Sequence, residues 1–347
     1  MNPHPQNLNP PRTCGTDQLP TARIKTTPED FVVDEVLGFE PAGQGEHIWI
    51  QVRKTGSNTR DLVDKLVLAT GVDARDIGYA GLKDKNAVTT QWFSIRQPMH
   101  EPLSAEMHNV EGVELLRVER GERKIRIGSH RKNCFAIVLR DVHGDRQLLE
   151  AQIEKITQRG FPNYFGTQRF GHDGRNVFAA RSMFENRRRK VTRFKRGIYL
   201  SAARSWLFNG VLSQRVQDSN WLTVQHGDVC MLDGSHSIFQ VQQANDDLQR
   251  RLDEHDIHLT GPLVGSGESP VRGRVYELEQ NCIQDEQTLV NGLIDAGLGH
   301  ERRALRAIAE NLQTDWIDER TLRLSFCLAR GVYATSLLRE LVDVVNP

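Results

Sequence analysis

A strand pattern returns near the end of the chain after a long helical stretch, and this return restricts the possible folds more than any other feature. Residues 321–328 (TLRLSFCL) alternate as a strand does. Before them, residues 201–217, 243–255 and 301–312 place apolar side chains at helical spacing. We therefore predict that the C-terminal segment completes a sheet begun by the N-terminal segment, and that the middle of the chain is an inserted domain.

The first part of the chain is rich in predicted strands. Apolar alternation and turn signals place strands at 31–33, 47–54, 77–81, 88–96, 123–127 and 135–142. Asn58 begins a helix to about residue 70, and Gly71 ends it. Short strands around 224–241 and a closing helix at 335–344 complete the prediction. Together the elements indicate the α+β class.

Length and composition are those of an ordinary globular protein. The 347 residues are enough for two domains, and 38% of them are hydrophobic and 26% charged. No apolar run has the roughly 18 residues that a membrane helix needs, so we expect no membrane partner. Residues 1–20 are rich in Asn, Pro and Gln and lack the pattern of a signal peptide, which indicates a flexible N-terminal tail.

The five cysteines indicate neither a zinc site nor a redox pair. No two of them lie at C-x-x-C spacing. The scattered cysteines and the lack of a signal-peptide pattern favour a reducing, cytoplasmic setting. The cysteines are Cys14, Cys134, Cys230, Cys282 and Cys327.

Charge is balanced overall but segregated along the chain. A net charge of zero argues against a nucleic-acid partner, which usually requires a basic excess. Residues 187–196 (RRRKVTRFKR), however, contain seven basic residues and no acid, and residues 117–140 contain eight basic residues against two acids. Such runs are either solvated surface or a cationic face for RNA phosphates.

The segment 78–92 (GYAGLKDKNAVTTQW) contains the first candidate for chemistry. An apolar strand ends before Asp84, which Lys83 and Lys85 flank in a polar turn. Nearby positive charge favours the ionised carboxylate, and an ionised, positioned carboxylate can act as a nucleophile. Asp is also common in ordinary turns, and the spacing alone favours that simpler interpretation.

Two further segments combine aromatic, amide and basic side chains. Residues 162–171 (PNYFGTQRFG) include Asn163 and Arg169 together with three aromatic residues, a set that suits RNA stacking and phosphate contact. Residues 331–341 (GVYATSLLREL) place Tyr333 just before a predicted helix. A glycine-rich loop anchored by its aromatic residues, and a packed tyrosine at a strand-to-helix corner, are the alternatives.

Taken together, these segments resemble the TruD family of tRNA pseudouridine synthases, and the resemblance covers nearly the whole chain after the N-terminal tail. Several long motifs in one order are far more specific than a single short pattern. The motifs are TPEDFVVDEVLGFEPAGQGEH (27–47), GLKDKNAVTTQW (81–92), PNYFGTQRFG (162–171), YLSAARSWLFN (199–209), PLVGSG (262–267) and YATSLLREL (333–341).

The resemblance implies a fold and a substrate. It implies a pseudouridine synthase catalytic domain with a central, largely antiparallel sheet at 21–158 and 308–347. An inserted α/β TRUD domain would occupy 159–307. The implied substrate is tRNA, at uridine 13. No cofactor or metal is expected, because the isomerisation involves no redox change and no transfer to a second molecule. We expect no obligatory protein partner.

The resemblance also implies site residues. Asp84 falls on the catalytic nucleophile, and Phe31 and Asn133 fall on substrate-binding positions. Tyr333 falls where the family usually has Phe, and it keeps the stacking face while adding a hydroxyl. Supporting roles are expected for Lys83, Lys85, Asn163 and Arg169, and the run 187–196 is expected to contact phosphate from the inserted domain.

The sequence leaves the chemical route and two rival functions open. Asp84 attacks the base, attacks the sugar, or removes a sugar proton. One rival is an RNA-binding protein without catalysis, and the intact GLKDK segment argues against it. The other is an Asp-nucleophile hydrolase such as a phosphatase, which needs Mg²⁺ and further carboxylates, whereas residues 83–92 contain no second acid.

Overall fold

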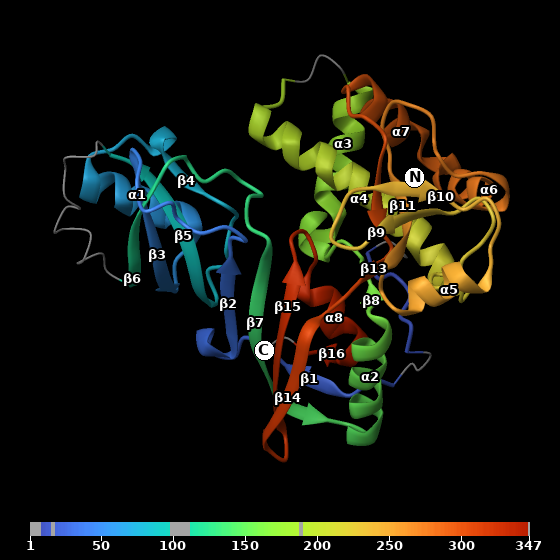
Figure 1. Cartoon of the computed structure of the whole chain (residues 1–347), viewed down its shortest axis with the longest axis horizontal. Coiled ribbons are helices and arrows are strands. Elements are labelled where there is room, and N and C mark those ends of the chain that lie inside the picture. The colour runs from blue at the N-terminus through green and yellow to red at the C-terminus, as the bar shows by residue number, and fades with distance from the viewer. Residues whose placement is uncertain (1–7, 15–17, 98–111, 187–189, 346–347) are drawn as a thin grey trace. The chain divides into compact units, whose positions relative to one another are not determined.

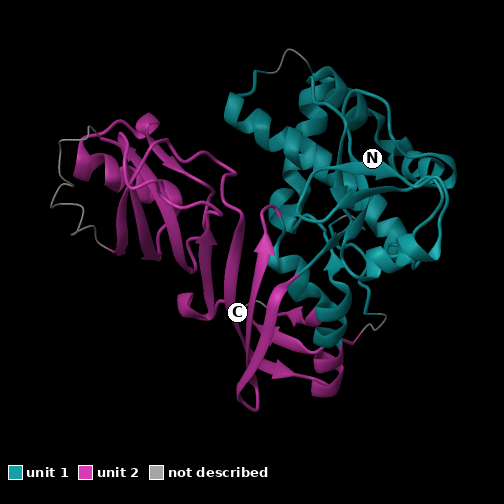
Figure 2. Ribbon diagram, viewed as in Figure 1, with its two compact units in different colours: residues 1–17, 152–308, 332–340 teal, residues 18–151, 309–331, 341–347 magenta. Residues whose placement is uncertain are grey.

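The structure is a computed structural model that describes residues 8–14, 18–97, 112–186 and 190–345. The chain forms two compact units, each built from separated segments (Figure 2). Unit 1 comprises 1–17, 152–308 and 332–340, and unit 2 comprises 18–151, 309–331 and 341–347. These units do not follow the predicted domains at 332–340, which fall in unit 1, and the domain assignment stays a prediction.

Unit 2 is built on a ten-stranded sheet in the order β14-β15-β7-β2-β5-β3-β6, with β1 beside β7 and β16, and β4 beside β5 (Figure 1). Most neighbours are antiparallel, and the parallel pairs are β1 with β16 and β2 with β5. The strands are β1 (Thr21–Arg23), β2 (Phe31–Val36), β3 (His47–Thr55), β4 (Ile77–Tyr79), β5 (Val88–Arg96), β6 (Val113–Gly121), β7 (Lys132–His143), β14 (Glu310–Asp318), β15 (Thr321–Ala329) and β16 (Asp343–Val344).

The late strand completes the first sheet, as predicted. β15 pairs with β7 without interruption from Leu322, opposite Leu139, to Ala329, opposite Lys132. The prediction of an α+β fold with a largely antiparallel sheet is therefore confirmed.

Helix α1 (Thr59–Thr70) covers part of this sheet, and its sequence determines both its ends and its buried face. The Asn58 side chain accepts backbone N–H groups of the first turn, and Gly71 ends the helix with φ +69° in the left-handed region. Leu62 and Leu66 are buried against apolar side chains of β3 and β5. This packing fixes the N-terminus of α1 beside the turn that contains Asp84.

The predicted strand at 123–127 is wrong, and the strand lies earlier, at β6. Ile125 is buried in a small cluster with Trp49 and Trp92. Its backbone N–H donates to Ser94 Oγ over 2.8 Å instead of joining a strand ladder. A single buried isoleucine in an irregular segment produced the alternation that indicated a strand.

Unit 1 combines helices with two small sheets, in the orders β10-β9-β11-β12 and β13-β8. α4 crosses its core and buries Ala202, Trp206, Leu207 and Val211. The elements are β8 (Phe161–Pro162), α3 (Arg175–Glu185), α4 (Arg193–Gln217), β9 (Val229–Leu232), β10 (Ile238–Gln240), α5 (Asp246–Asp253), β11 (Ile257–Leu263), α6 (Gly273–Ile283), α7 (Gln287–Asp295), β12 (Glu301–Ala304) and β13 (Arg306–Ala307). α2 (Arg146–Arg159) begins in unit 2 and ends in unit 1, and α8 (Ala334–Leu341) lies in unit 1 except for its last residue.

The predicted helix at 301–312 is also wrong. Its residues form β12, β13 and the start of β14. The segment is rich in Ala, Leu, Glu and Arg, which favour helices. Pairing of Thr260 with Ala304 and of Glu310 with Cys327 overrides that preference, because a weak propensity yields to tertiary hydrogen bonding.

Residues 8–14 of the predicted N-terminal tail pack within unit 1, whereas residues 18–20 belong to unit 2. Arg339 Nη1 donates to Pro11 O over 3.3 Å, and Thr13 Oγ1 donates to the Glu340 carboxylate over 2.8 Å. Leu8 packs against the core around α4. Residues 1–7 and 15–17 lie outside the described residues.

Two cysteines that the spacing left unpaired are cross-strand partners. Cys134 on β7 and Cys327 on β15 face each other and form a disulfide. The sequence spacing gave no sign of this pair, because the two cysteines are 193 residues apart in sequence and meet only through strand pairing.

Candidate active site

Asp84 lies in the turn between β4 and β5, and this turn is anchored on both sides. Thr59, the first residue of α1, accepts the Lys83 N–H at its Oγ1 over 2.8 Å. The same hydroxyl donates to Gln91 Oε1 over 3.2 Å, and Gln91 Nε2 donates to the carbonyl of Gly81. The backbone before Asp84 is therefore held between the helix terminus and β5.

The Asp84 carboxylate pairs with the ammonium group of Lys25. Lys25 Nζ donates to Asp84 Oδ2, and the Asn86 N–H donates to Oδ1 over 3.2 Å. Partial burial raises the pKa of Asp84, but the hydrogen bond and charge of Lys25, together with the backbone N–H groups of Asn86 and Lys85, outweigh burial and hold that pKa below its usual value. With 44% of its side chain exposed, Asp84 is both ionised and accessible.

Lys25 is itself held in place. Its backbone lies in the left-handed region at φ +57°, which is uncommon for a residue other than glycine. Its Nζ lies 4.4 Å from the centroid of the Phe31 ring, a favourable cation–π distance. Phe31 is only 7% exposed and meets Phe135 edge to face. In this structure the Phe31 ring therefore supports Lys25.

The lysines that flank Asp84 do not pair with its carboxylate. Lys83 Nζ donates to Glu35 Oε2 over 2.7 Å and to Asn133 Oδ1 over 2.9 Å. Lys85 is exposed, and only its backbone N–H serves the Asp84 carboxylate. The expectation that Lys83 or Lys85 keeps Asp84 ionised is therefore corrected, since Lys25 supplies that charge.

A second lysine contacts the turn that contains Asp84. Lys54, 1% exposed, donates from Nζ to the carbonyls of Ser57 over 2.6 Å and Asp84 over 3.3 Å. Burial lowers the pKa of Lys54 to about 8; the carboxylate of Asp84 opposes this shift, and the charge of Lys83 adds to it. Sequence reasoning missed Lys25 and Lys54, because both lie on segments far from Asp84 in the chain.

The remaining predicted residues form a group in unit 1. Tyr333, which precedes α8, accepts a hydrogen bond at its hydroxyl from Arg169 Nε over 2.9 Å. Arg169 Nη1 donates to Ser201 Oγ over 3.0 Å. A Cβ on Gly166 would lie 2.8 Å from Thr335 Oγ1, so the loop approaches Tyr333 closely only because residue 166 is glycine.

Asn163 and a half-buried arginine complete this group. Arg303 stacks over the Phe165 ring, with Cζ 4.1 Å from the ring centroid. Its Nη2 donates to Asn163 Oδ1, and Asn163 Nδ2 donates to Ala304 O over 2.9 Å. Burial lowers the pKa of Arg303 to about 10. Asn163 is thus occupied by structural hydrogen bonds.

Unit 2 therefore brings together Phe31, Lys83, Asp84 and Asn133, and unit 1 brings together Asn163, Arg169 and Tyr333. Within the described ranges, no three His, Cys, Asp or Glu residues are grouped so that they could hold a metal ion. No helix in the part of the chain that is described is long and apolar enough to cross a membrane.

The basic run 187–196 leads into α4. Arg187–Arg189 lie outside the described residues, whereas Lys190, Arg193, Lys195 and Arg196 are exposed. Three of these cations occupy the first turn of α4, where the positive end of the helix dipole disfavours them. An anionic ligand would relieve this repulsion.

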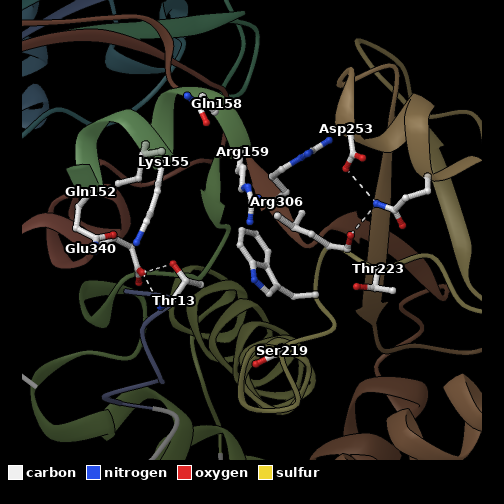
Figure 3. A pocket seen from close by; sticks show the side chains of 15 residues that line it. Thr13, Gln152, Lys155, Gln158, Arg159, Ser219, Thr223, Asp253, Arg306 and Glu340 are labelled. Atoms are coloured by element: carbon white, nitrogen blue, oxygen red, sulfur yellow. Dashed lines mark hydrogen bonds between the residues drawn. The ribbon is translucent and has the colours of Figure 1, made fainter. Parts of the chain in front are cut away.

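Unit 1 also contains cavities that the predicted site residues do not line. A cavity of about 550 Å³ lies beside α2, with Lys155, Arg159 and Arg306 in its wall (Figure 3). A second, of about 530 Å³, is bordered by part of the motif 262–267, including Pro262 and Gly267, together with Tyr276.

The arrangement around Asp84 is suited to nucleophilic or general-base chemistry. An accessible carboxylate, a lysine that keeps it ionised and an anchored turn are what such chemistry requires. The amide of Asn133 is linked to the turn that contains Asp84, because its oxygen accepts a hydrogen bond from the Lys83 side chain.

Comparisons with known proteins agree in pointing to one family. The model of the family "tRNA pseudouridine synthase D (TruD)" matches residues 15–179 and 178–341. A tRNA pseudouridine synthase D of Methylococcus capsulatus is 42% identical over 341 residues, covering 96% of each chain. The one of Proteus mirabilis is 42% identical over 327 residues, covering 94% of this chain and 93% of the relative.

A solved structure shares the fold. The crystal structure of a protein described as a tRNA pseudouridine synthase D (TruD) from Methanosarcina mazei superposes with a TM-score of 0.75. It covers 100% of this chain and 99% of its own, at 19% sequence identity.

Proposed function

The chain belongs to the TruD family of tRNA pseudouridine synthases, isomerases that convert uridine to pseudouridine, and we propose that it modifies uridine 13 of tRNA with Asp84 as its nucleophile. The observation that carries this proposal is the Asp84–Lys25 pair. It combines an ionised carboxylate with an open side chain, on a turn whose backbone is fixed from two sides.

The reaction explains why such a carboxylate is needed. The N1–C1′ bond of uridine breaks, the base turns, a C5–C1′ bond forms, the C5 proton is lost, and N1 takes up a proton. Atoms balance within one nucleotide, so we expect no cofactor. An ionised Asp84 serves attack on the base, attack on the sugar, or removal of a sugar proton, and these three routes remain alternatives.

The substrate base must leave its stack before it reaches Asp84, at a cost of a few kcal/mol. We propose that Asn133 hydrogen-bonds the flipped uridine and that the Tyr333 ring offers it a stacking face. Phe31 is also proposed to contact the substrate, and its contact with Lys25 supports a role in placing that lysine. Arg169 holds the Tyr333 hydroxyl.

RNA phosphates are proposed to meet the exposed cations around the start of α4, including Arg193 and Lys195. Their placement against the helix dipole supports an anionic partner. We expect tRNA to be the partner and the reaction to occur in the cytoplasm, without an obligatory protein partner.

The test is to map pseudouridine in a tRNA transcript after incubation with the protein in EDTA. We expect one new pseudouridine, at position 13, and none in a transcript with cytidine there. Modification at another position would refute the assignment of the site. Binding of tRNA without any product would favour an RNA-binding protein that has lost catalysis, and hydrolysis that appears only when EDTA is replaced by Mg²⁺ would favour the hydrolase.

A further inference from the structure

Lys83 lies beside Asp84 in sequence, yet its ammonium group points into a buried network. Glu35 on β2 and Asn133 on β7 are directly opposite in the strand register, so both side chains lie on one face of the sheet. Lys83 Nζ lies 2.7 Å from Glu35 Oε2 and 2.9 Å from Asn133 Oδ1. The side chain of Lys83 is 6% exposed and that of Glu35 is 0% exposed.

The network leaves Lys83 little freedom. Glu35 Oε1 accepts the Trp92 backbone N–H over 3.2 Å, so both oxygens of the carboxylate are engaged. At the other end, Thr59 fixes the backbone N–H of Lys83. A buried ion pair contributes little net stability compared with an apolar pair of similar volume. Stability alone therefore does not account for this arrangement.

The ammonium group decides which way the Asn133 amide faces. A lysine ammonium has three donors and no acceptor, so the atom of Asn133 beside it must be the carbonyl oxygen. The amide NH₂ group then faces away from Lys83. Among the described residues, none accepts a hydrogen bond from this group. Without Lys83, the terminal amide would be free to turn and present its oxygen instead.

This orientation has a consequence for base recognition, which rests on the proposed function above. Uracil carries a carbonyl oxygen at C4, whereas cytosine carries an amino group there. A side-chain amide that can only donate forms a hydrogen bond with the C4 carbonyl oxygen of uracil. At the same place, the amino group of cytosine offers two N–H donors and no acceptor. We propose that Lys83 is a positioning residue that holds Asn133 as a hydrogen-bond donor, and that Asn133 held in this way selects uracil over cytosine.

The test compares two RNAs with one protein. The KM is measured for tRNA with uridine at the target position, and the Ki is measured for the same tRNA with cytidine there as a competitive inhibitor. In Lys83→Met, we expect the ratio of Ki to KM to fall roughly tenfold, because a freely turning Asn133 amide no longer distinguishes the exocyclic groups of the two bases. Lys83→Arg, which also only donates, should keep most of the ratio. Lys85→Met, at an exposed neighbour, should keep all of it.

Folding is controlled by a second variant. Lys83→Met leaves Glu35 buried and unpaired, which is destabilising. Glu35→Met with Lys83→Met removes both charges together and should show the same fall in the ratio, with a cooperative thermal transition. A structural defect would weaken both RNAs alike and leave the ratio unchanged, and that result in a folded variant overturns the inference. Absence of product from the wild type would instead refute the proposed function.

Discussion

Lys25 Nζ is hydrogen-bonded to the carboxylate of Asp84 although the two residues are 59 positions apart. Neither lysine next to Asp84 in sequence forms this ion pair. The pairing separates two tasks. Lys25 sets the charge of Asp84, while Lys83 is directed to Glu35 and Asn133.

Replacing Lys25 should change the pH dependence of the reaction. In Lys25→Met, burial raises the pKa of Asp84 without the opposing ammonium. Activity requires the ionised carboxylate, so the acid limb of the kcat/KM profile should move to higher pH, and the loss at pH 5 should exceed the loss at pH 7. Profiles from pH 4 to 8 measure this shift. Lys85→Met is the matched control, and identical acid limbs in Lys25→Met and the wild type would contradict the proposed role.

The hydroxyl of Tyr333 should matter for stability more than for activity. Tyr333→Phe keeps the ring but removes the acceptor for Arg169, and we expect the free energy of unfolding to fall by about 1–2 kcal/mol. A double-mutant cycle with Arg169→Met, followed by urea unfolding, should give a coupling energy of similar size. Strict additivity of the two substitutions would show that the hydrogen bond contributes nothing.

The ring of Tyr333 should matter for activity. Tyr333→Phe should retain most of the kcat/KM of the wild type, whereas Tyr333→Ala should lose roughly tenfold or more, because stacking of one base contributes ~1–3 kcal/mol. Steady-state kinetics on a tRNA transcript separates the two. Equal activities of the Phe and Ala variants would remove Tyr333 from the substrate pocket.

Neutralising the cations around the start of α4 should weaken the salt dependence of RNA binding. With Arg193, Lys195 and Arg196 changed to Gln, the slope of log K against log salt should become shallower by up to about 0.9 for each duplex phosphate that the protein no longer neutralises. Filter binding at several salt concentrations gives the slope. Arg250→Gln is the control, because Arg250 already pairs with Asp247 and Glu254. An unaltered slope would make the run ordinary solvated surface.

Lys54 should make stability rise with pH in the alkaline range. Its pKa is lowered to about 8 in the folded protein from an ordinary value of 10.5. Between these values the unfolded chain binds one more proton than the folded chain, so the free energy of unfolding increases with pH, by up to roughly 3 kcal/mol. Urea unfolding at pH 7, 8, 9 and 10 should show this rise in the wild type and lose it in Lys54→Met. Parallel pH curves would refute the shift.

Local sequence patterns were sufficient to predict elements whose side chains alternate along a strand or cap a helix. The sequence prediction for β5 matched its bounds, 88–96, and the helix beginning after Asn58 was predicted with its end at Gly71. Strand alternation and helix caps are local properties, so one chain segment contains all the information they need.

Pairing across the chain could not be read in this way. Residues 301–312 favour a helix by composition, but their partners on β11 and β15 make them strands. The residues of the candidate site also differ in how far the sequence could predict them. Asp84 lies in a quoted motif and Asn133 falls on a position that the resemblance implies, whereas the pairing of Lys25 with Asp84 depends on how separated segments fold together.

Tritium release from tRNA transcripts carrying 5-tritiated uridine tests the central claim most directly. Wild type and Asp84→Asn are compared in EDTA, with tRNA binding measured on the same samples. We predict release by the wild type alone, with tRNA binding largely intact in both, since the substitution removes the charge of one side chain and little else. Substantial release by Asp84→Asn would contradict the role of Asp84 as the nucleophile.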